Sequence, residues 1–431
     1  MEILLSLSIA LFAGLMLSRL AKLVKLPAVT AYLVAGILIG PYCRGALGID
    51  GLGFTSMANV KSFSIISDVA LGFIAFSIGN EFRIAQLKKT GKQATVIGIV
   101  QACAATLLVD AALIGLHFLM PDKLPLPSAI ILGAIASATA PAATLMVVRQ
   151  YKAKGPLTDI LLPIVALDDA VGLVLFAISF GVAKALMSGR IDVLSIIVEP
   201  LLEVILSLLL GLVMGLLFTF FERFFHSRSK RLSMSVTFVF LTVALSMLEF
   251  KIGGVHIAFS SLLVCMMLGT VFCNACDISE ELMDRVDRWT APLFILFFVI
   301  SGAELELSVF ADIAIVIVGV VYIIARSAGK YTGAYLSARA TKCEPSIVKY
   351  LGVTLLPQAG VALGMAIKAE HIGPEGAIVA NITLFAVLIY ELAGPMLTKI
   401  ALLKAGDIKP EGKTSARELA KSEKAAKHAL K

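Results

Sequence analysis

Long apolar runs separated by short polar segments are the feature that most constrains the fold of this chain. The runs are about 20 residues long, which is the length that a helix needs to cross a hydrocarbon core of about 30 Å. Hydrophobic residues make up 59% of the chain and charged residues 16%, against about 45–50% and about 25% in a typical soluble domain. Because lipid offers the backbone no hydrogen-bond partners, each run is expected to be a helix. The sequence therefore predicts an all-α polytopic membrane protein.

We identify thirteen such segments and expect each to cross the membrane. The first is not read as a cleavable signal, because Glu2 stands where a basic leader would be and a second apolar segment follows closely. The segments are 3–22, 27–41, 62–82, 93–119, 127–149, 157–186, 195–222, 232–249, 254–272, 290–303, 308–338, 346–368 and 374–403.

The distribution of Lys and Arg predicts the orientation of these segments. Loops after odd-numbered segments are rich in both residues, for example at Arg223, Arg228 and Lys230. Loops after even-numbered segments contain only Arg44, Lys61, Lys123, Arg190 and Lys251. The positive-inside rule then places the N-terminus outside and the C-terminus in the cytoplasm. Residues 405–431 are predicted to be a basic cytoplasmic tail, either solvated or in contact with lipid head groups.

Neither the net charge nor the cysteines indicate a further partner. The net charge of +7 is explained by the topology, so we expect no nucleic acid. The six cysteines are too scattered for a disulfide scaffold, and the Cys273-x-x-Cys276 motif has no second ligand pair after it. We therefore expect no cofactor.

Helix-breaking residues fall at matching places in the two halves of the chain. The fifth segment contains Ser-Ala-Thr-Ala-Pro, ending at Pro141, and the twelfth contains Leu-Pro-Gln-Ala-Gly, with Pro357, Gln358 and Gly360. A proline lacks the N–H of a helical residue and disfavours helix at the residue before it. The two segments are seven apart. Because successive segments cross the membrane in opposite directions, an odd offset gives the two segments opposite orientations. Segments 1–6 and 8–13 would then be inverted repeats joined by a linker helix. One buried proline is commonly a packing kink, but paired interruptions indicate a transporter's binding site.

Two adjacent acids lie in the middle of the sixth segment. Asp168 and Asp169 stand among apolar residues, where each carboxylate is expensive to desolvate and each raises that cost for the other. Neighbouring residues on a helix point about 100° apart, so one can face a cavity while the other faces another helix. A purely structural pairing of both acids with neighbouring helices is the simpler alternative.

The eleventh segment offers a basic partner. Arg326 and Lys330 are four residues apart and share one helix face. Lysine is the better switchable partner, because it can lose its proton whereas arginine stays charged; which of the two pairs with Asp168 is left open. Two acids and a base suit the exchange of a monovalent cation for protons, since both compete for the same carboxylates.

Other polar residues have simpler interpretations. His256 is read as a structural histidine, and Glu81, Glu304 and Glu391 as interface anchors, with pH sensing as the alternative for Glu81. The acidic stretch 277–287 is read as a solvated loop. An intramembrane aspartyl protease needs two carboxylates that converge on one water, which adjacent helical residues do not do. A passive channel would need a filter-like loop, and none is visible, so the sequence predicts a transporter and not an enzyme.

The sequence also resembles a known family, the bacterial sodium/proton antiporters of the cation/proton antiporter superfamily, in the branch with an Asp-Asp pair. Residues 26–41 (LPAVTAYLVAGILIGP) resemble its second-helix signature, and 75–82 (AFSIGNEF) its FxxGxE helix end. Residues 138–144 (ATAPAAT) resemble the first unwound helix, and Lys330 fits the family's lysine position. Residues 357–360 (PQAG) stand where the family often has Pro-Arg-Gly, so this chain has an extra residue and no Arg there.

The resemblance implies a domain arrangement. Residues 1–92 and 232–307 would form a dimerisation scaffold, 93–194 and 308–404 an ion-translocating core around two crossed, broken helices, and 195–231 the linker helix. It further implies a homodimer in the lipid of a bacterial inner membrane, working by elevator-like alternating access.

The resemblance also implies roles for individual residues. Asp169 would bind Na⁺, and Asp168 would pair with Lys330 when the cation is absent and contribute to the site when it is present. Ser137 and Thr139 would supply the oxygen ligands that a hard cation prefers. Exchange would then be electrogenic. Nothing in the sequence sets the cation's size, so Li⁺ and K⁺ remain alternatives to Na⁺, and a potassium/proton antiporter is the rival function.

Overall fold

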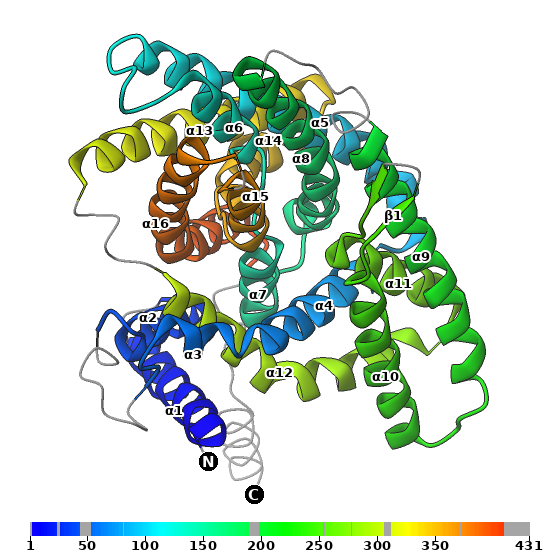
Figure 1. The fold of residues 1–431 in the computed structure, drawn as a ribbon. Coiled ribbons are helices and arrows are strands. Elements are labelled where there is room, and N and C mark those ends of the chain that lie inside the picture. Colours follow the sequence, from blue (N-terminus) through cyan, green and yellow to red (C-terminus); the bar gives the residue numbers. More distant parts are fainter. Residues whose placement is uncertain are drawn as a thin grey trace, which may run out of the picture.

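The computed structural model describes residues 2–23, 26–43, 53–80, 82–188, 198–252, 255–276, 278–305, 312–370 and 372–408. Within them the chain forms helices and one short hairpin (Figure 1). The helices of the first half are α1 (Glu2–Leu23), α2 (Ala28–Ile39), α3 (Met57–Lys61), α4 (Ser64–Asn80), α5 (Ile84–His117), α6 (Leu126–Ile135), α7 (Pro141–Tyr151), α8 (Pro156–Ser188) and α9 (Glu199–Glu222). Those of the second half are α10 (Arg228–Ser246), α11 (Ser261–Ala275), α12 (Ser279–Glu304), α13 (Ile313–Ala340), α14 (Pro345–Thr354), α15 (Gly360–Glu370) and α16 (Pro374–Ala405). Glu81, the side chain of His256 and the tail beyond residue 408 lie outside the described residues.

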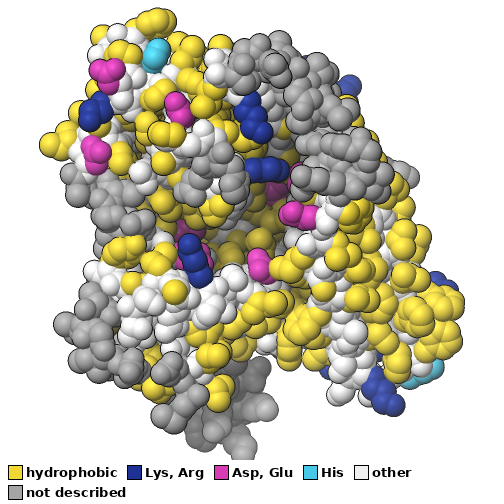
Figure 2. Space-filling view, viewed as in Figure 1, with side chains coloured by type: hydrophobic (Ala, Val, Ile, Leu, Met, Phe, Trp, Pro, Cys, Tyr) yellow, Lys and Arg dark blue, Asp and Glu magenta, His cyan; other side chains and the backbone are white. Residues whose placement is uncertain are grey.

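Seven of the described helices are long and apolar enough to cross a membrane, and several shorter apolar helices accompany them. Each predicted segment overlaps one helix or a pair of shorter helices. Large apolar side chains such as Leu107, Leu216 and Ile324 are exposed on the helix surfaces, and Figure 2 shows hydrophobic side chains spread over the periphery of one face. This surface is that of a multi-pass membrane protein. The count of thirteen crossings and the inverted repeat stay predictions.

Two helix starts differ from the sequence prediction. A hairpin of β1 (Phe250–Ile252) and β2 (Val255–Ile257) occupies the expected start of the ninth segment. Helix α11 begins only at Ser261, because the side chain of Ser260 accepts a hydrogen bond from the N–H of Leu263 and caps it. Conversely, much of the acidic stretch expected to be a loop forms the first turns of α12, where Arg285 pairs with Glu281 one turn away at 3.0 Å.

The helices pack as two groups. One group contains α5, α6, α8, α13, α14, α15 and α16, and the other contains α1, α2, α4, α9, α10, α11 and α12. One apolar cluster of the second group also takes in Leu162 and Ala166 of α8. Helix α7 lies near the centre of Figure 1, between the two groups. In the second group, α2 and α12 approach closely at Gly36 and Gly302, where an added Cβ would clash with a carbonyl oxygen of the partner helix. The domain boundaries given above remain a prediction.

Both interruptions expected at the prolines are present. Helix α6 ends at Ile135 and α7 starts with Pro141, and α14 ends at Thr354 and α15 starts at Gly360. Pro141 is the first residue of its helix, where a missing N–H is tolerated. The two irregular stretches, 136–140 and 355–359, touch where the N–H of Ala140 donates to the carbonyl oxygen of Pro357 at 2.8 Å. We call this contact region the crossing.

Candidate functional site

Arg326 holds the crossing together. Its side chain, fully buried on α13, donates from Nε to the carbonyl of Ala136 at 3.0 Å, from Nη1 to that of Leu356 at 2.7 Å, and from Nη2 to that of Ala138 at 2.6 Å. The guanidinium also lies 4.5 Å from the centre of the Tyr390 ring. Helix ends leave carbonyl groups unpaired and partly negative, so Arg326 stabilises the carboxyl ends of α6 and α14 together.

Gln358 adds a second link across the crossing. Its Nε2 donates to the carbonyl oxygen of Ile135 at 2.9 Å, and its amide also bonds to the hydroxyl of Tyr322. This residue lies where the family often has arginine, and here Arg326 reaches the crossing from α13. Gly360 starts α15 with open space around it, since an added Cβ would meet no atom within 4 Å.

Asp168 is fully buried and surrounded by donors. Lys330 Nζ lies 2.9 Å from its Oδ2, the Thr139 hydroxyl donates to the same oxygen at 2.5 Å, and Gln101 Nε2 donates to Oδ1. The structure therefore places Lys330 beside Asp168, while Arg326 bonds to backbone carbonyls. The sequence prediction did not include Gln101, because it rested on ionisable residues inside the apolar segments. A glutamine inside an apolar segment is also a polar group that needs a buried partner, and it could have indicated the site.

The unwound stretch 136–140 contributes further polar atoms to Lys330. Lys330 Nζ donates to the carbonyl oxygen of Ser137 at 2.5 Å and to the hydroxyl of Thr139 at 2.8 Å. The Ser137 hydroxyl donates to the carbonyl of Ala134 at 2.7 Å. The hydroxyl of Thr139 and the carbonyl of Ser137 are thus occupied by the ion pair in this structure. These two oxygens and Asp168 Oδ2 therefore all contact the ammonium group of Lys330.

Asp169 is buried but has none of these partners. Only 2% of the residue is exposed, and neither carboxylate oxygen has a hydrogen-bond donor among the described residues. A buried, ionised carboxylate without a partner is strongly destabilising. Asp169 is therefore suited to carry either a proton or a bound cation, one in place of the other.

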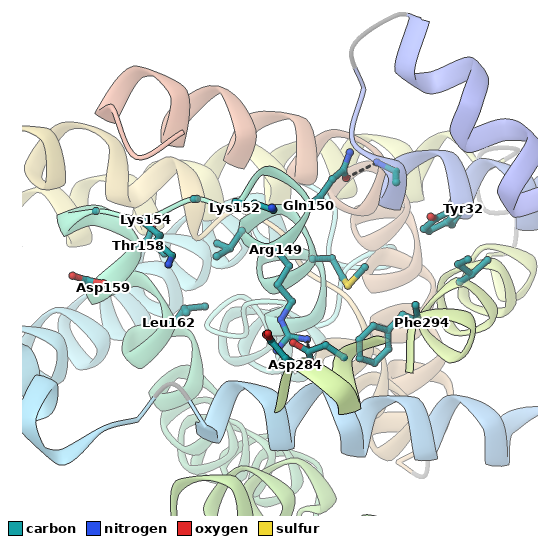
Figure 3. Close-up of a pocket in the computed structure, with 18 of the residues that line it drawn as sticks. Tyr32, Arg149, Gln150, Lys152, Lys154, Thr158, Asp159, Leu162, Asp284 and Phe294 are labelled. Carbon is teal, nitrogen blue, oxygen red and sulfur yellow. Dashed lines mark hydrogen bonds and ion pairs between the residues drawn. The ribbon is translucent and has the colours of Figure 1, made fainter. Parts of the chain in front are cut away.

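A cavity of about 920 Å³ opens between the two helix groups. It is lined by α7, α8 and their connection on one side, and by α2 and α12 on the other (Figure 3). Leu162 and Pro163 of α8 belong to its wall. Asp169 lies six residues beyond Pro163, about 9 Å further along the helix axis. Figure 2 shows a hollow at the middle of the face viewed, with charged side chains around it.

Two contacts join α7 to helices of the second group at this cavity. Arg149 of α7 pairs with Asp287 of α12 at 2.6 Å, and the Gln150 side-chain oxygen accepts a hydrogen bond from the N–H of Ala28 at 2.8 Å (Figure 3). Helix α8 is fixed at its start by Asp407, whose Oδ2 accepts from the Thr158 N–H and hydroxyl at 2.6 and 2.7 Å. The helix that carries both acids is thus anchored at the cavity end.

Comparisons with known proteins agree with this architecture. The family model described as "Sodium/hydrogen exchanger, transmembrane" matches residues 7–404. The chain is 25% identical over 422 residues to the Na(+)/H(+) antiporter NhaS4 of Synechocystis sp., covering 93% of this chain and 96% of that protein. It is 23% identical over 394 residues to the K(+)/H(+) antiporter subunit KhtU of Bacillus subtilis, covering 89% of each.

A solved structure has the same fold. The sodium proton antiporter MjNhaP1 from Methanocaldococcus jannaschii, at pH 8, superposes with a TM-score of 0.66 and 21% identity. The match covers 94% of this chain and 99% of that one. Because the family model spans nearly the whole chain, we conclude that this multi-pass membrane protein belongs to the sodium/hydrogen exchanger family of cation/proton antiporters, which are secondary transporters and not enzymes.

Proposed function

We propose that this protein exchanges Na⁺ for protons at Asp169, with the Asp168–Lys330 pair as the second proton-linked element. The observation that carries the proposal is the contrast between the two acids. Asp168 has three side-chain partners, whereas both Asp169 oxygens lack a partner among the described residues. A buried carboxylate whose oxygens have no donor among the described residues is one where H⁺ and a cation compete.

The exchange proceeds in balanced steps. Na⁺ binds Asp169 and displaces its proton. Asp168 and the oxygens of Ser137 and Thr139 then complete the cation's ligand set as Lys330 gives up its proton and leaves the ion pair. Two protons leave for each Na⁺ that enters, so one net positive charge crosses the membrane per cycle. The membrane potential biases such a cycle by about 2.3 kcal/mol per 100 mV.

The two packed helix groups support alternating access. In this proposal, the group with α5, α6, α8 and α13–α16 carries the site past the group with α1, α2, α4 and α9–α12, which forms the homodimer. The cavity is lined on α8 by Pro163, six residues before Asp169, and also by Lys152 and Lys154, whose side of the membrane the positive-inside rule makes cytoplasmic. The N-terminus then lies outside a bacterial inner membrane.

Potassium/proton exchange is the second candidate. It is favoured by the likeness to KhtU, whose name describes a K(+)/H(+) antiporter subunit and whose identity to this chain is close to that of NhaS4. Carboxylate, hydroxyl and carbonyl oxygens suit any hard monovalent cation, so the residue types leave the choice to the size of the site.

Transport by purified protein in liposomes tests the proposal. With an imposed pH gradient, addition of Na⁺, Li⁺ or K⁺ in turn reports which cation is exchanged for protons. Asp169→Asn is expected to reduce exchange to the level of empty liposomes while the melting temperature is retained, because the amide has nearly the size and shape of the carboxyl group but cannot carry a negative charge or exchange a proton. Exchange by Asp169→Asn at the wild-type rate would refute the site, and wild-type exchange with K⁺ alone would establish the second candidate.

A further inference from the structure

A second set of acids lies where the two helix groups meet, away from Asp169. Glu391 of α16 interacts electrostatically with Glu304 at the end of α12, and Glu304 interacts with Asp68 of α4. Lys61, which is exposed, interacts with Glu304. Helix α16 belongs to one group, and α12 and α4 to the other. We call Glu391, Glu304 and Asp68 the far-side acids.

Glu391 carries an unpartnered oxygen in a buried setting. Only 5% of the residue is exposed, and its Oε2 has no hydrogen-bond donor among the residues that the structure describes. Pro395 follows four residues later inside α16, so the helix lacks the N–H that would bond to the Glu391 carbonyl. The residue thus combines a buried carboxylate that has no counter-charge among the described residues with a backbone oxygen that lacks its helical donor. Both groups attract a cation.

The far-side acids lie beyond the crossing when viewed from the cavity. Near the cavity end of α16, Lys399 Nζ lies 5.1 Å from the centre of the Tyr151 ring, and at the other end the Ser128 hydroxyl donates to the Glu375 carbonyl at 2.9 Å. Between them, an added Cβ at Gly394 would lie 3.0 Å from Pro357 of the crossing. Glu391 is one turn from Gly394, toward the end away from the cavity.

Positions along helix α12 also place the far-side acids on the side of the molecule opposite the cavity. Asp287 belongs to the cavity wall, and Glu304 ends the helix seventeen residues later, about 26 Å along its axis. Along the line from the cavity to the other side of the molecule, the order is therefore the cavity, Asp169 near the crossing, Glu391, and then Glu304 with Asp68.

We propose that Glu391, with Glu304 and Asp68, forms a second site for a monovalent cation on the side opposite the cavity, where the cation is held before it reaches Asp169 or after it leaves. This inference rests on the proposed exchange at Asp169. Carboxylate and carbonyl oxygens suit a hard cation, and grouped acids between low-dielectric walls raise the local cation concentration. Because the acids come from both helix groups, a cation between them also relieves their mutual repulsion.

Binding of Na⁺ without transport tests the site directly. The full chain is purified in detergent, and its melting temperature is measured as Na⁺ replaces N-methylglucamine at constant ionic strength, since a ligand of the folded state raises the melting temperature. In an Asp169→Asn background, Na⁺ is expected to raise the melting temperature still. Adding Glu391→Gln is expected to abolish that rise, whereas adding Asp122→Asn, which removes an exposed acid on the same side, is expected to leave it.

Two results of this measurement would overturn the second site. One is the absence of any Na⁺-dependent rise in Asp169→Asn, and the other is a rise that survives Glu391→Gln. Neither depends on transport, so they are distinct from failure of the proposed function, which is continued exchange by Asp169→Asn. If Glu391→Gln does not fold, Glu304→Gln at the helix end gives the same comparison.

Transport measured with Na⁺ added on one side of the membrane at a time gives a second readout, in the protein with Asp169 intact. Glu391→Gln is expected to raise the half-saturating Na⁺ concentration at least fivefold when Na⁺ is added on the far side. The change is expected to be less than twofold when Na⁺ is added on the cavity side. An equal rise from both sides, or no rise at all, contradicts a far-side site.

Discussion

Two neighbouring aspartates on one helix have opposite surroundings in this protein. Asp168 is held by Lys330, Thr139 and Gln101, and Asp169, rotated about 100° around α8, has no hydrogen-bond donor among the described residues. The first acid is fixed in place and the second is left to be neutralised from outside. The different surroundings of the two acids follow from helix geometry and from which neighbouring helix each residue faces.

Gln101 is predicted to fix the orientation of Asp168. Gln101→Met removes a hydrogen bond to a charged group, which contributes about 1.5–3 kcal/mol, whereas a bond between neutral groups contributes about 0.5–1.5 kcal/mol. The matched control is Gln93→Met on the same helix, because Gln93 Nε2 donates to a neutral group, the carbonyl of Thr341, at 3.0 Å. We expect a larger loss of melting temperature and of exchange rate for Gln101→Met, measured on both purified variants. Equal effects of the two substitutions would contradict this role.

The sequence identified the charged members of the site but not their uncharged partners. Asp168, Asp169 and Lys330 stand out because ionisable residues are rare inside apolar segments. Gln101 and Tyr322 carry no charge, and their importance depends on contacts with residues far away in the chain. Which of Arg326 and Lys330 lies beside Asp168 also depended on packing, since both share one face of α13.

At the scale of elements, Arg326 is the side chain that bonds to both interrupted stretches of the crossing. Arg326 donates to three carbonyl oxygens of the two interrupted helices, so the negative ends of α6 and α14 can lie close together inside the membrane. The breaks were predictable from Pro141 and Pro357, because proline acts through local sterics. The role of Arg326 was not, because it arises from the approach of three separate segments.

Arg326→Gln is predicted to destabilise the protein more than Gln101→Met does. It leaves buried carbonyl groups without donors, and each such group costs about 1–3 kcal/mol. Arg326→Lys keeps the charge but cannot supply three donors in the same plane, so an intermediate loss is expected. Thermal unfolding in detergent measures the order wild type, Arg326→Lys, Arg326→Gln. A melting temperature for Arg326→Gln equal to that of the wild type would contradict the role assigned to this residue.

At the scale of the whole molecule, the cavity and the charge distribution predict one orientation. In a background without native cysteines, Lys152→Cys beside the cavity is expected to react with a membrane-impermeant maleimide only from the cytoplasmic side. Asp122→Cys, in the connection between α5 and α6, is expected to react only from outside. Labelling of both positions from the same side would contradict the proposed topology.

The helical, multi-pass fold was predictable from apolar segment length, because the membrane forces the backbone to satisfy its own hydrogen bonds. The places where charged residues extend a helix were not predictable in this way. Asp287 was expected in a loop, yet it lies on α12 and pairs with Arg149 of α7, which links α7 to the second helix group beside the cavity. A residue pair that joins separate groups leaves no periodic signal in the sequence.

The central claim, that the Asp168–Lys330 pair releases a second proton for each cation, is tested most directly by charge movement. Proteoliposomes adsorbed to a supported membrane report the transient current on a Na⁺ jump. The wild type is expected to give a current, because two protons are exchanged for one Na⁺. Lys330→Gln is expected to lose most of that current per ion exchanged. Exchange by the wild type without charge movement would contradict the claim, and equal currents from both proteins would show that Lys330 is not the second proton carrier.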